Sequence, residues 1–259
     1  MRIACVQMEV NDRSKAENLN HAEELIKGAE GADLILLPEI WNIGYFSFDS
    51  YEGESEPLEG ETAERMSRMA RNVGAWLLAG SWVVRGPDGL YNTSFLFDRK
   101  GDVVTTYRKI HLFGYGSREQ EFLKKGNEIV TIETELGVLG LASCYDLRFP
   151  ELFRKMMIRG VEIFLIVSGW PYPRLEHWVL FNRVRAVENL CFLASANCVG
   201  VNRGIRFCGH SSIVDPWGVI RAGGGDEETI VTTDIDLEMV KRVRKEFPAV
   251  HDIVFQAEA

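Results

Sequence analysis

Cys144 is the residue whose type and position most favour catalysis. The apolar run 138–142 predicts a buried strand, a polar turn that contains Cys144 follows, and residues 149–159 have a helical pattern. At such a junction, backbone N–H groups and the positive end of the helix dipole stabilise a thiolate and lower its pKa from an ordinary value of about 8.5. The position therefore indicates a nucleophile, although a cysteine that only fills the core explains this stretch equally well.

Two further reactive side chains follow predicted strands. Glu39 comes after the apolar run 33–37, and Lys109 comes after residues 103–107. Catalytic groups of α/β proteins collect at the carboxyl ends of strands, so the three side chains are candidates for one site. Taken alone, each has a structural explanation, Glu39 as a loop cap and Lys109 as a solvated strand end.

The frame that must position these residues is an alternation of strands and helices. Strands are predicted at residues 2–8, 33–37, 76–83, 90–97, 103–107, 138–142, 162–167 and 191–197. Helices are predicted at residues 14–28, 62–73, 149–159, 176–189 and 237–247. Residues 209–214, 219–222 and 230–234 are typical of a β-meander, and the tail 248–259 is expected to be extended.

The two halves of the chain resemble each other, which bears on the fold class. Residues 93–98 precede a glycine turn, as residues 211–215 do. Two α/β halves of this kind are expected to stack sheet on sheet with helices outside. A doubly wound single sheet is the competing topology, and the hydrophobic pattern is compatible with both.

Composition excludes several classes of function. The chain has 259 residues with Lys+Arg 29 against Asp+Glu 38, a net charge of -9, so we expect neither nucleic-acid nor membrane binding. The longest apolar run, 163–167, is far shorter than a membrane span. The odd number of cysteines, without a C-x-x-C pair or a secretion signal, favours free thiols in the cytoplasm, a Cys198–Cys208 disulfide being the alternative. The histidines are scattered singly, so no metal site is expected.

Together, the three candidate residues resemble the motifs of the nitrilase superfamily, the carbon–nitrogen hydrolases. Residues 36–39 match its glutamate motif, 107–113 its lysine motif and 143–151 its cysteine motif, in the family's order. The N-terminal strand with Gln7 and the segments 209–211 and 215–218 extend the resemblance over essentially the whole chain.

This resemblance implies a fold and a reaction. The fold is a single carbon–nitrogen hydrolase domain over residues 1–259, an αββα sandwich of two stacked mixed sheets flanked by helices, without a cofactor. In the reaction, Cys144 attacks an amide or nitrile carbon and Glu39 acts as general base. Lys109 and the backbone N–H of Tyr145 stabilise the oxyanion. Homo-oligomers, dimers or larger, are common in the family.

The family also has a second active-site glutamate in the loop after the lysine. The pattern of an acid before apolar residues and a glycine assigns this role to Glu119. Glu121 competes for it, because residues 114–117 make the loop longer than in some relatives. A solvated loop charge is the structural explanation for either residue.

Within the superfamily, residues 144–151 and 169–171 resemble the ω-amidase branch, which hydrolyses the terminal amide of small carboxylate-bearing substrates such as 2-oxoglutaramate. Arg148 would bind the distal carboxylate through two hydrogen bonds. The alternative for this residue is a structural ion pair with Asp146 or Glu151.

Aromatic side chains complete the predicted pocket. Tyr45, Phe46 and Trp170 are candidates for its walls, with plain core packing as the alternative. An aliphatic nitrilase, an N-carbamoyl-amine amidohydrolase and a catalytically silent binding module of the same fold are the competing functions. A nucleotide-binding protein is disfavoured, because no glycine-rich phosphate loop follows the first strand.

Overall fold

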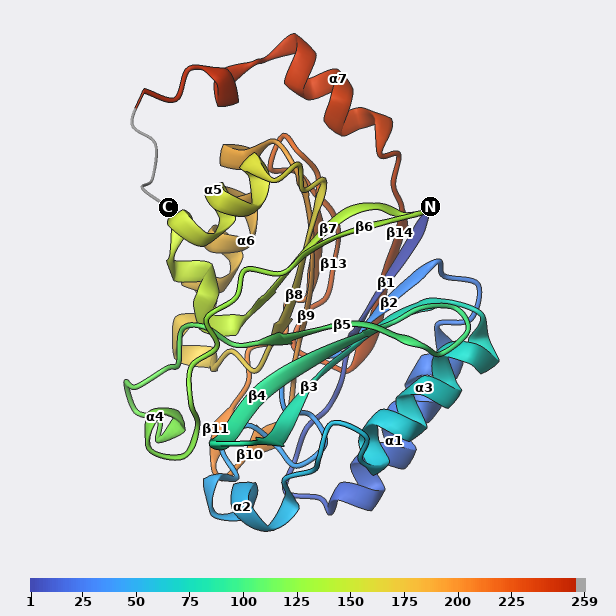
Figure 1. The fold of residues 1–259 in the computed structure, drawn as a ribbon, viewed down its shortest axis with the longest axis vertical. Helices are drawn as coiled ribbons and strands as arrows, with labels where there is room; N and C mark the ends of the chain where they lie inside the picture. Colours follow the sequence, from blue (N-terminus) through green and yellow to red (C-terminus); the bar gives the residue numbers. More distant parts are fainter. Residues whose placement is uncertain (255–259) are drawn as a thin grey trace.

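Two six-stranded sheets stack face to face, and helices cover the outer face of each (Figure 1). The computed structural model describes residues 1–254. The chain folds as two successive α/β halves, and each half builds one layer of the sandwich.

The first sheet belongs mainly to the N-terminal half. Its strands are β1 (Arg2–Gln7), β2 (Leu34–Leu36), β3 (Trp76–Gly86), β4 (Gly89–Phe97), β5 (Val103–Arg108) and β14 (Thr229–Asp234). Their order is β14-β1-β2-β3-β4-β5, with β1, β2 and β3 parallel and the other neighbours antiparallel. Helices α1 (Lys15–Gly28) and α3 (Glu61–Val73) cover its outer face. The predicted capping box begins α1, since the Ser14 and Glu17 side chains bond each other's backbone N–H.

The second sheet repeats this arrangement. Its strands are β6 (Thr131–Thr134), β7 (Gly137–Ser143), β8 (Ile163–Ser168), β9 (Phe192–Asn197), β12 (Ser212–Val214) and β13 (Ile220–Gly223). Their order is β13-β12-β9-β8-β7-β6, again with three parallel strands between antiparallel neighbours. Helices α5 (Pro150–Ile158) and α6 (Leu175–Asn189) lie outside it. The predicted likeness of the segments near 93 and 211 is confirmed, because β4 and β12 hold equivalent places in the two sheets.

The remaining elements lie outside the two six-stranded sheets. They are α2 (Tyr51–Glu54), α4 (Glu119–Phe122), the β10 (Val201–Asn202) and β11 (Ile205–Arg206) pair, and the helix α7 (Glu238–Glu246). Single 3-10 turns occur at Phe48–Ser50, Cys144–Arg148, Tyr172–Arg174 and Ala249–His251. In Figure 1, α7 crosses the end of the sandwich opposite to α2. No helix within residues 1–254 has the length and apolar character needed to cross a bilayer.

Alternating side chains of the buried strands explain why the sandwich forms. In β8, Ile163 and Leu165 pack in the cluster between the sheets, whereas Phe164 packs against the outer helices. In β2, Leu34 likewise faces the other sheet and Ile35 faces the helices of its own layer. Strands buried on both faces need apolar residues at every position, which produces the continuous apolar runs. The predicted αββα sandwich is confirmed, and a doubly wound single sheet is excluded.

The predicted free thiols are confirmed, since Cys198 and Cys208 are both free and buried and the alternative disulfide does not form. Two local predictions were wrong. The expected β-meander does not form, because β14 leaves the β12–β13 hairpin and pairs with the edge of β1, where Val231 reaches the cluster between the sheets. The tail contains the 3-10 turn Ala249–His251 where an extended chain was expected, and residues 255–259 of that prediction lie outside the described residues.

Candidate active site

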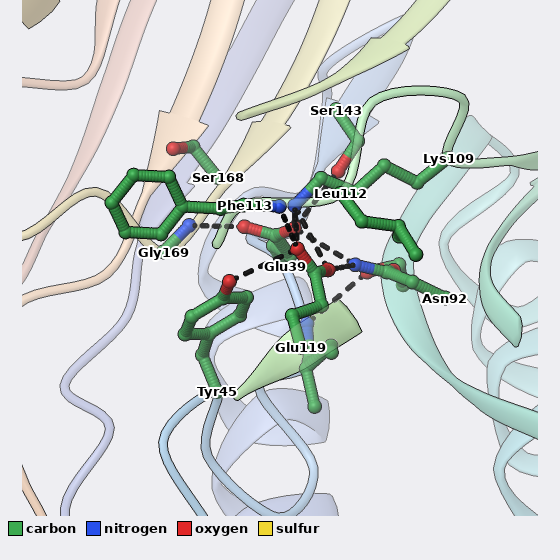
Figure 2. Close-up of polar contacts among 12 residues, drawn as sticks. Glu39, Tyr45, Asn92, Lys109, Leu112, Phe113, Glu119, Ser143, Ser168 and Gly169 are labelled. Atoms are coloured by element: carbon green, nitrogen blue, oxygen red, sulfur yellow. Dashed lines mark hydrogen bonds and ion pairs between the residues drawn. The ribbon is translucent and has the colours of Figure 1, made fainter. Parts of the chain in front are cut away.

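The predicted reactive residues meet at the carboxyl ends of strands from both sheets. Glu39 follows β2, Lys109 follows β5 and Cys144 follows β7, while Gly169 follows β8. Strands β2 and β5 point the same way in the first sheet, so their ends reach the same edge. The side chains of Glu39, Lys109 and Glu119 converge there in a network of hydrogen bonds (Figure 2).

Lys109 is the centre of this network. Its Nζ donates to Glu39 Oε1 at 2.8 Å and to the two carboxylate oxygens of Glu119 at 2.9 and 3.0 Å, and all three side chains are fully buried. Burial alone would lower the pKa of Lys109, but the charges of Glu119 and Glu39 outweigh it and hold the pKa well above its ordinary value. The ammonium is therefore charged at neutral pH.

Glu119, rather than Glu121, belongs to the network. The Tyr45 hydroxyl donates to Glu119 Oε2 at 3.1 Å and the Phe113 backbone N–H donates to the same oxygen at 2.7 Å. Burial and the charge of Glu39 raise the pKa of Glu119, opposed by Lys109. Glu121 is exposed and pairs with Arg118. It cannot join the network, because residues two positions apart on a helix, such as 119 and 121, point their side chains in different directions.

Glu39 is held by donors from four segments. Its Oε1 accepts from Asn92 Nδ2 at 2.8 Å and from the Ser143 hydroxyl at 3.1 Å, in addition to Lys109. Its Oε2 accepts from the Gly169 backbone N–H at 2.9 Å. Asn92 also donates to Glu119 Oε1 at 3.2 Å and so bridges the two carboxylates, a contact that was not predicted from the sequence.

Cys144 lies on a strained turn. The backbone φ of Cys144 is 45°, in the left-handed region, which is unfavourable for a residue with a side chain. Cys144 is also the first residue of the 3-10 turn that precedes α5. Burial raises its pKa well above the ordinary value, and the charge of Glu39 adds to this, opposed by Lys109. The predicted thiolate stabilisation was wrong, because α5 begins only at Pro150 and burial beside a carboxylate dominates.

Asp146 joins this turn to residues 107–113, the lysine segment, which carries Lys109. Its Oδ2 accepts from the Tyr107 hydroxyl at 2.6 Å and from the Ser143 backbone N–H at 2.8 Å. Its Oδ1 lies 2.7 Å from His111 Nδ1. Both carboxylate oxygens are thus taken by other groups, and within residues 1–254 Arg148 forms no ion pair with Asp146 or Glu151, the alternative role considered for that arginine.

A small pocket opens in front of the thiol. Its empty space, including the open mouth, is about 280 Å³. Its lining residues are Tyr45, Phe113, Cys144, Tyr145, Arg148, Gly169, Trp170, Pro171 and Arg174. Phe46 is not one of them, because its ring stacks on Phe207 and contacts the edge of Tyr45. The prediction that Phe46 forms part of the pocket wall was therefore wrong.

Arg148 lines the pocket among aromatic side chains. Its guanidinium lies between aromatic rings, 5.1 Å from the centre of the Trp170 ring and 5.7 Å from that of Tyr145. Its Nη2 is 3.1 Å from His177 Nδ1, and within residues 1–254 it makes no ion pair with a carboxylate. The second arginine of the lining, Arg174, was missed, and its only signal was a cation shortly after the predicted aromatic wall.

Comparison with known proteins agrees with this geometry. The family model for carbon-nitrogen hydrolase matches residues 2–245. A 2-oxoglutaramate amidase from Bacillus subtilis is 38% identical, over 97% of this chain and 96% of the relative. The crystal structure of a CN-hydrolase superfamily protein from Xanthomonas campestris, with an arsenic adduct in its active site, has a TM-score of 0.93 and 30% identity, covering 100% of this chain and 99% of that one.

A third comparison concerns the thiol. A mutant amidase from a Nesterenkonia species carries the acetamide moiety of fluoroacetamide on its active-site cysteine. It has a TM-score of 0.80 and 26% identity, covering 97% of this chain and 95% of that one. The chain described here belongs to the carbon–nitrogen hydrolase family. The predicted class of activity, hydrolysis of a C–N bond by a thiol enzyme, is confirmed with it.

Proposed function

We propose that the protein hydrolyses the terminal amide of a small carboxylate-bearing substrate such as 2-oxoglutaramate and releases ammonia through a thioester on Cys144. The observation that carries this proposal is Arg148, a half-buried guanidinium in the pocket of Cys144 that has no carboxylate partner within residues 1–254. A guanidinium matches a carboxylate in two hydrogen bonds. The name of the Bacillus subtilis relative, 2-oxoglutaramate amidase, supports the same substrate.

The first half of the reaction forms the thioester. Cys144 Sγ attacks the amide carbon while its proton passes to Glu39, and the carbonyl oxygen becomes an oxyanion. Lys109 and the Tyr145 backbone N–H stabilise that charge. Glu39 then donates the proton to the amide nitrogen, the C–N bond breaks and ammonia leaves. The raised pKa of Cys144 supports this sequence, because a thiol that is neutral at rest needs a neighbouring base.

The second half regenerates the thiol. Water attacks the thioester carbon and gives a proton to Glu39, and the C–S bond breaks as the tetrahedral intermediate collapses. The proton of Glu39 returns to Sγ, and the carboxylic acid product leaves. The Asn92 and Ser143 donors hold Glu39 in one orientation through both halves.

Glu119 serves Lys109 rather than the thiol in this mechanism. Its carboxylate accepts two hydrogen bonds from Lys109 Nζ and compensates for the burial that would otherwise remove the ammonium proton. Tyr45 and the Phe113 backbone N–H fix the carboxylate in turn. An ammonium kept charged and oriented before substrate binds needs no reorganisation when the oxyanion forms.

A substrate panel tests the proposal. We expect kcat/KM for 2-oxoglutaramate to exceed those for a neutral aliphatic amide, a nitrile and an N-carbamoyl amine, measured as ammonia or acid release. The Cys144→Ala variant should be inactive and should give no acyl adduct on the peptide with residue 144 by mass spectrometry. A neutral amide or nitrile as the best substrate would contradict the carboxylate role, whereas an active Cys144→Ala variant would contradict the nucleophile.

We propose further that the protein acts in the cytoplasm as a homo-oligomer, a dimer or larger. Five free, buried cysteines support a reducing compartment. Leu180 and Val187 of α6 are exposed, as are Trp217 and Val219 in the adjacent β12–β13 turn, and such a patch is typical of an interface. Light scattering should give a mass of at least twice 29.3 kDa. A monomer at micromolar concentration would contradict the proposal.

A further inference from the structure

Two positive charges, Arg148 and Arg174, line the pocket of Cys144. Among the described residues, no carboxylate lines it with them. Within residues 1–254, neither guanidinium lies in an ion pair. Burial lowers the pKa of Arg148 and the charge of Arg174 adds to this, so the two guanidiniums are close enough to repel each other. Two like charges beside an apolar cavity are unfavourable until an anion enters.

The position of Arg174 is set by the pocket wall itself. Its backbone carbonyl accepts from Trp170 Nε1 at 2.9 Å, and its backbone N–H donates to the Pro171 carbonyl at 3.2 Å. Its guanidinium lies 5.1 Å from the centre of the Phe113 ring, and the Phe113 backbone N–H binds Glu119. The arginine is thus anchored on both sides, by the loop after β8 and by the lysine segment.

Arg174 is also the N-cap residue of α6, and among the described residues no side-chain hydrogen bond caps this helix end. Within residues 1–254, the Arg148 guanidinium has one polar partner, His177 Nδ1 at 3.1 Å, so its other donors can bind a ligand.

We propose that Arg174 is a specificity-determining residue. Together with Arg148, it binds the carboxylate at the far end of the substrate. This inference rests on the proposed function, since it assumes an amide substrate that carries a carboxylate. Arg148 alone supplies one pair of parallel donors, whereas two guanidiniums from separate turns, Cys144–Arg148 and Tyr172–Arg174, fix the position of the carboxylate and so its distance from Cys144. The pair thereby selects the length of the substrate as well as its charge.

A ratio of two substrates tests this role. Glutaramate and valeramide have the same length and the same amide, but valeramide has a methyl group where glutaramate has the carboxylate. We expect Arg174→Gln to lower the ratio of their kcat/KM values by roughly 10- to 100-fold, because hydrogen bonds to a charged group contribute that much. The loss should lie mainly in KM, since the carboxylate is bound equally in ground and transition states.

Two further variants keep the test sharp. Arg206→Gln is the matched control, because Arg206 also lies on an aromatic ring near the pocket but pairs with Asp226 and does not line it. It should change the ratio less than 2-fold. The double variant Arg148→Gln with Arg174→Gln should lose less than the product of the single losses if both residues bind one carboxylate.

The outcomes separate this inference from the proposed function. A wild-type ratio near one would contradict the proposed substrate class. A large wild-type ratio that Arg174→Gln leaves within about 3-fold would overturn the role of Arg174 alone. An equal loss for both substrates, or losses that multiply in the double variant, would also overturn it. Circular dichroism and thermal unfolding of each variant show that the compared proteins are folded.

Discussion

The Tyr107 hydroxyl donates a 2.6 Å hydrogen bond to Asp146 Oδ2 and joins the two segments that carry the reacting groups. Tyr107 lies two residues before Lys109, and Asp146 lies two residues after Cys144. The bond crosses from the first sheet to the second, and both groups are buried. It fixes the lysine and the nucleophile relative to each other more directly than any contact within one sheet.

Tyr107→Phe is therefore expected to be destabilising. The variant removes one donor from a buried carboxylate, which costs about 1.5–3 kcal/mol of the free energy of unfolding. Tyr91→Phe is the matched control, since its hydroxyl donates at 2.7 Å to Asp88, a largely solvated carboxylate. It should cost less than about 1 kcal/mol. Urea denaturation measures both, and equal losses in the two variants would contradict the structural role of the Tyr107 bond.

Glu119→Gln is expected to lower kcat by about 100-fold, because it removes a charge that holds Lys109 protonated and oriented. The pKa of Lys109 should fall in this variant, so its residual activity should decline with rising pH earlier than that of the wild type. Steady-state rates between pH 6 and 10 measure this shift. Glu121→Gln is the control and should change kcat less than 2-fold, since Glu121 forms only an exposed pair. A larger effect at position 121 than at 119 would reverse the assignment.

The raised pKa of Cys144 predicts how its alkylation depends on pH. Only the thiolate reacts, so the rate with iodoacetamide should still be rising at pH 9 and should show no plateau between pH 6 and 8. Mass spectrometry of the peptide with residue 144 separates this reaction from that of other cysteines. A plateau already at pH 6 would mean that the thiolate is stable beside Glu39, which the geometry does not predict.

Removing the charge of Glu39 should make the alkylation of Cys144 faster, although amide hydrolysis is lost. Glu39→Gln takes away a negative charge that raises the pKa of Cys144, while Lys109 continues to lower it. The pKa of Cys144 should therefore fall, and alkylation at pH 7 should become faster, as hydrolysis is lost with the general base. Slower alkylation in a folded Glu39→Gln variant would contradict the charge coupling of the two residues.

Much of the fold was predictable because burial dictates it locally. The strands and helices predicted between residues 2 and 197 are all present, with ends shifted by a few residues. Pairing between distant strands was not predictable. β14 has an ordinary strand pattern. It pairs with β1 and not with the nearby β12–β13 hairpin because of which sheet edge lacks a partner strand, and the sequence does not show this. β6, β10 and β11 are short, and too few residues alternate in them to give a signal.

The site residues that belong to the three motifs were predictable from the sequence. Those that strand register brings to the site were not. Glu39, Lys109 and Cys144 meet as expected. Asn92 reaches the cluster because the β4–β5 register sets its carbonyl against the Lys109 N–H at 2.9 Å, and nothing local in the sequence marks that. The wrong placement of Phe46 has the same origin, since an aromatic run does not reveal which ring faces the cavity.

Within residues 1–254 no carboxylate lines the pocket, and this charge arrangement predicts discrimination against L-glutamine. Glutamine carries the same amide and carboxylate as 2-oxoglutaramate, but an ammonium replaces the keto oxygen. That cation would lie near Arg148 and Arg174 with no acceptor carboxylate, so kcat/KM for glutamine should be at least roughly 100-fold lower. Glutaramate, which has only hydrogens at this carbon, should rank between the two and separates charge repulsion from loss of the keto group. If glutamine were hydrolysed as well as glutaramate, the charge arrangement inferred for this pocket would be wrong.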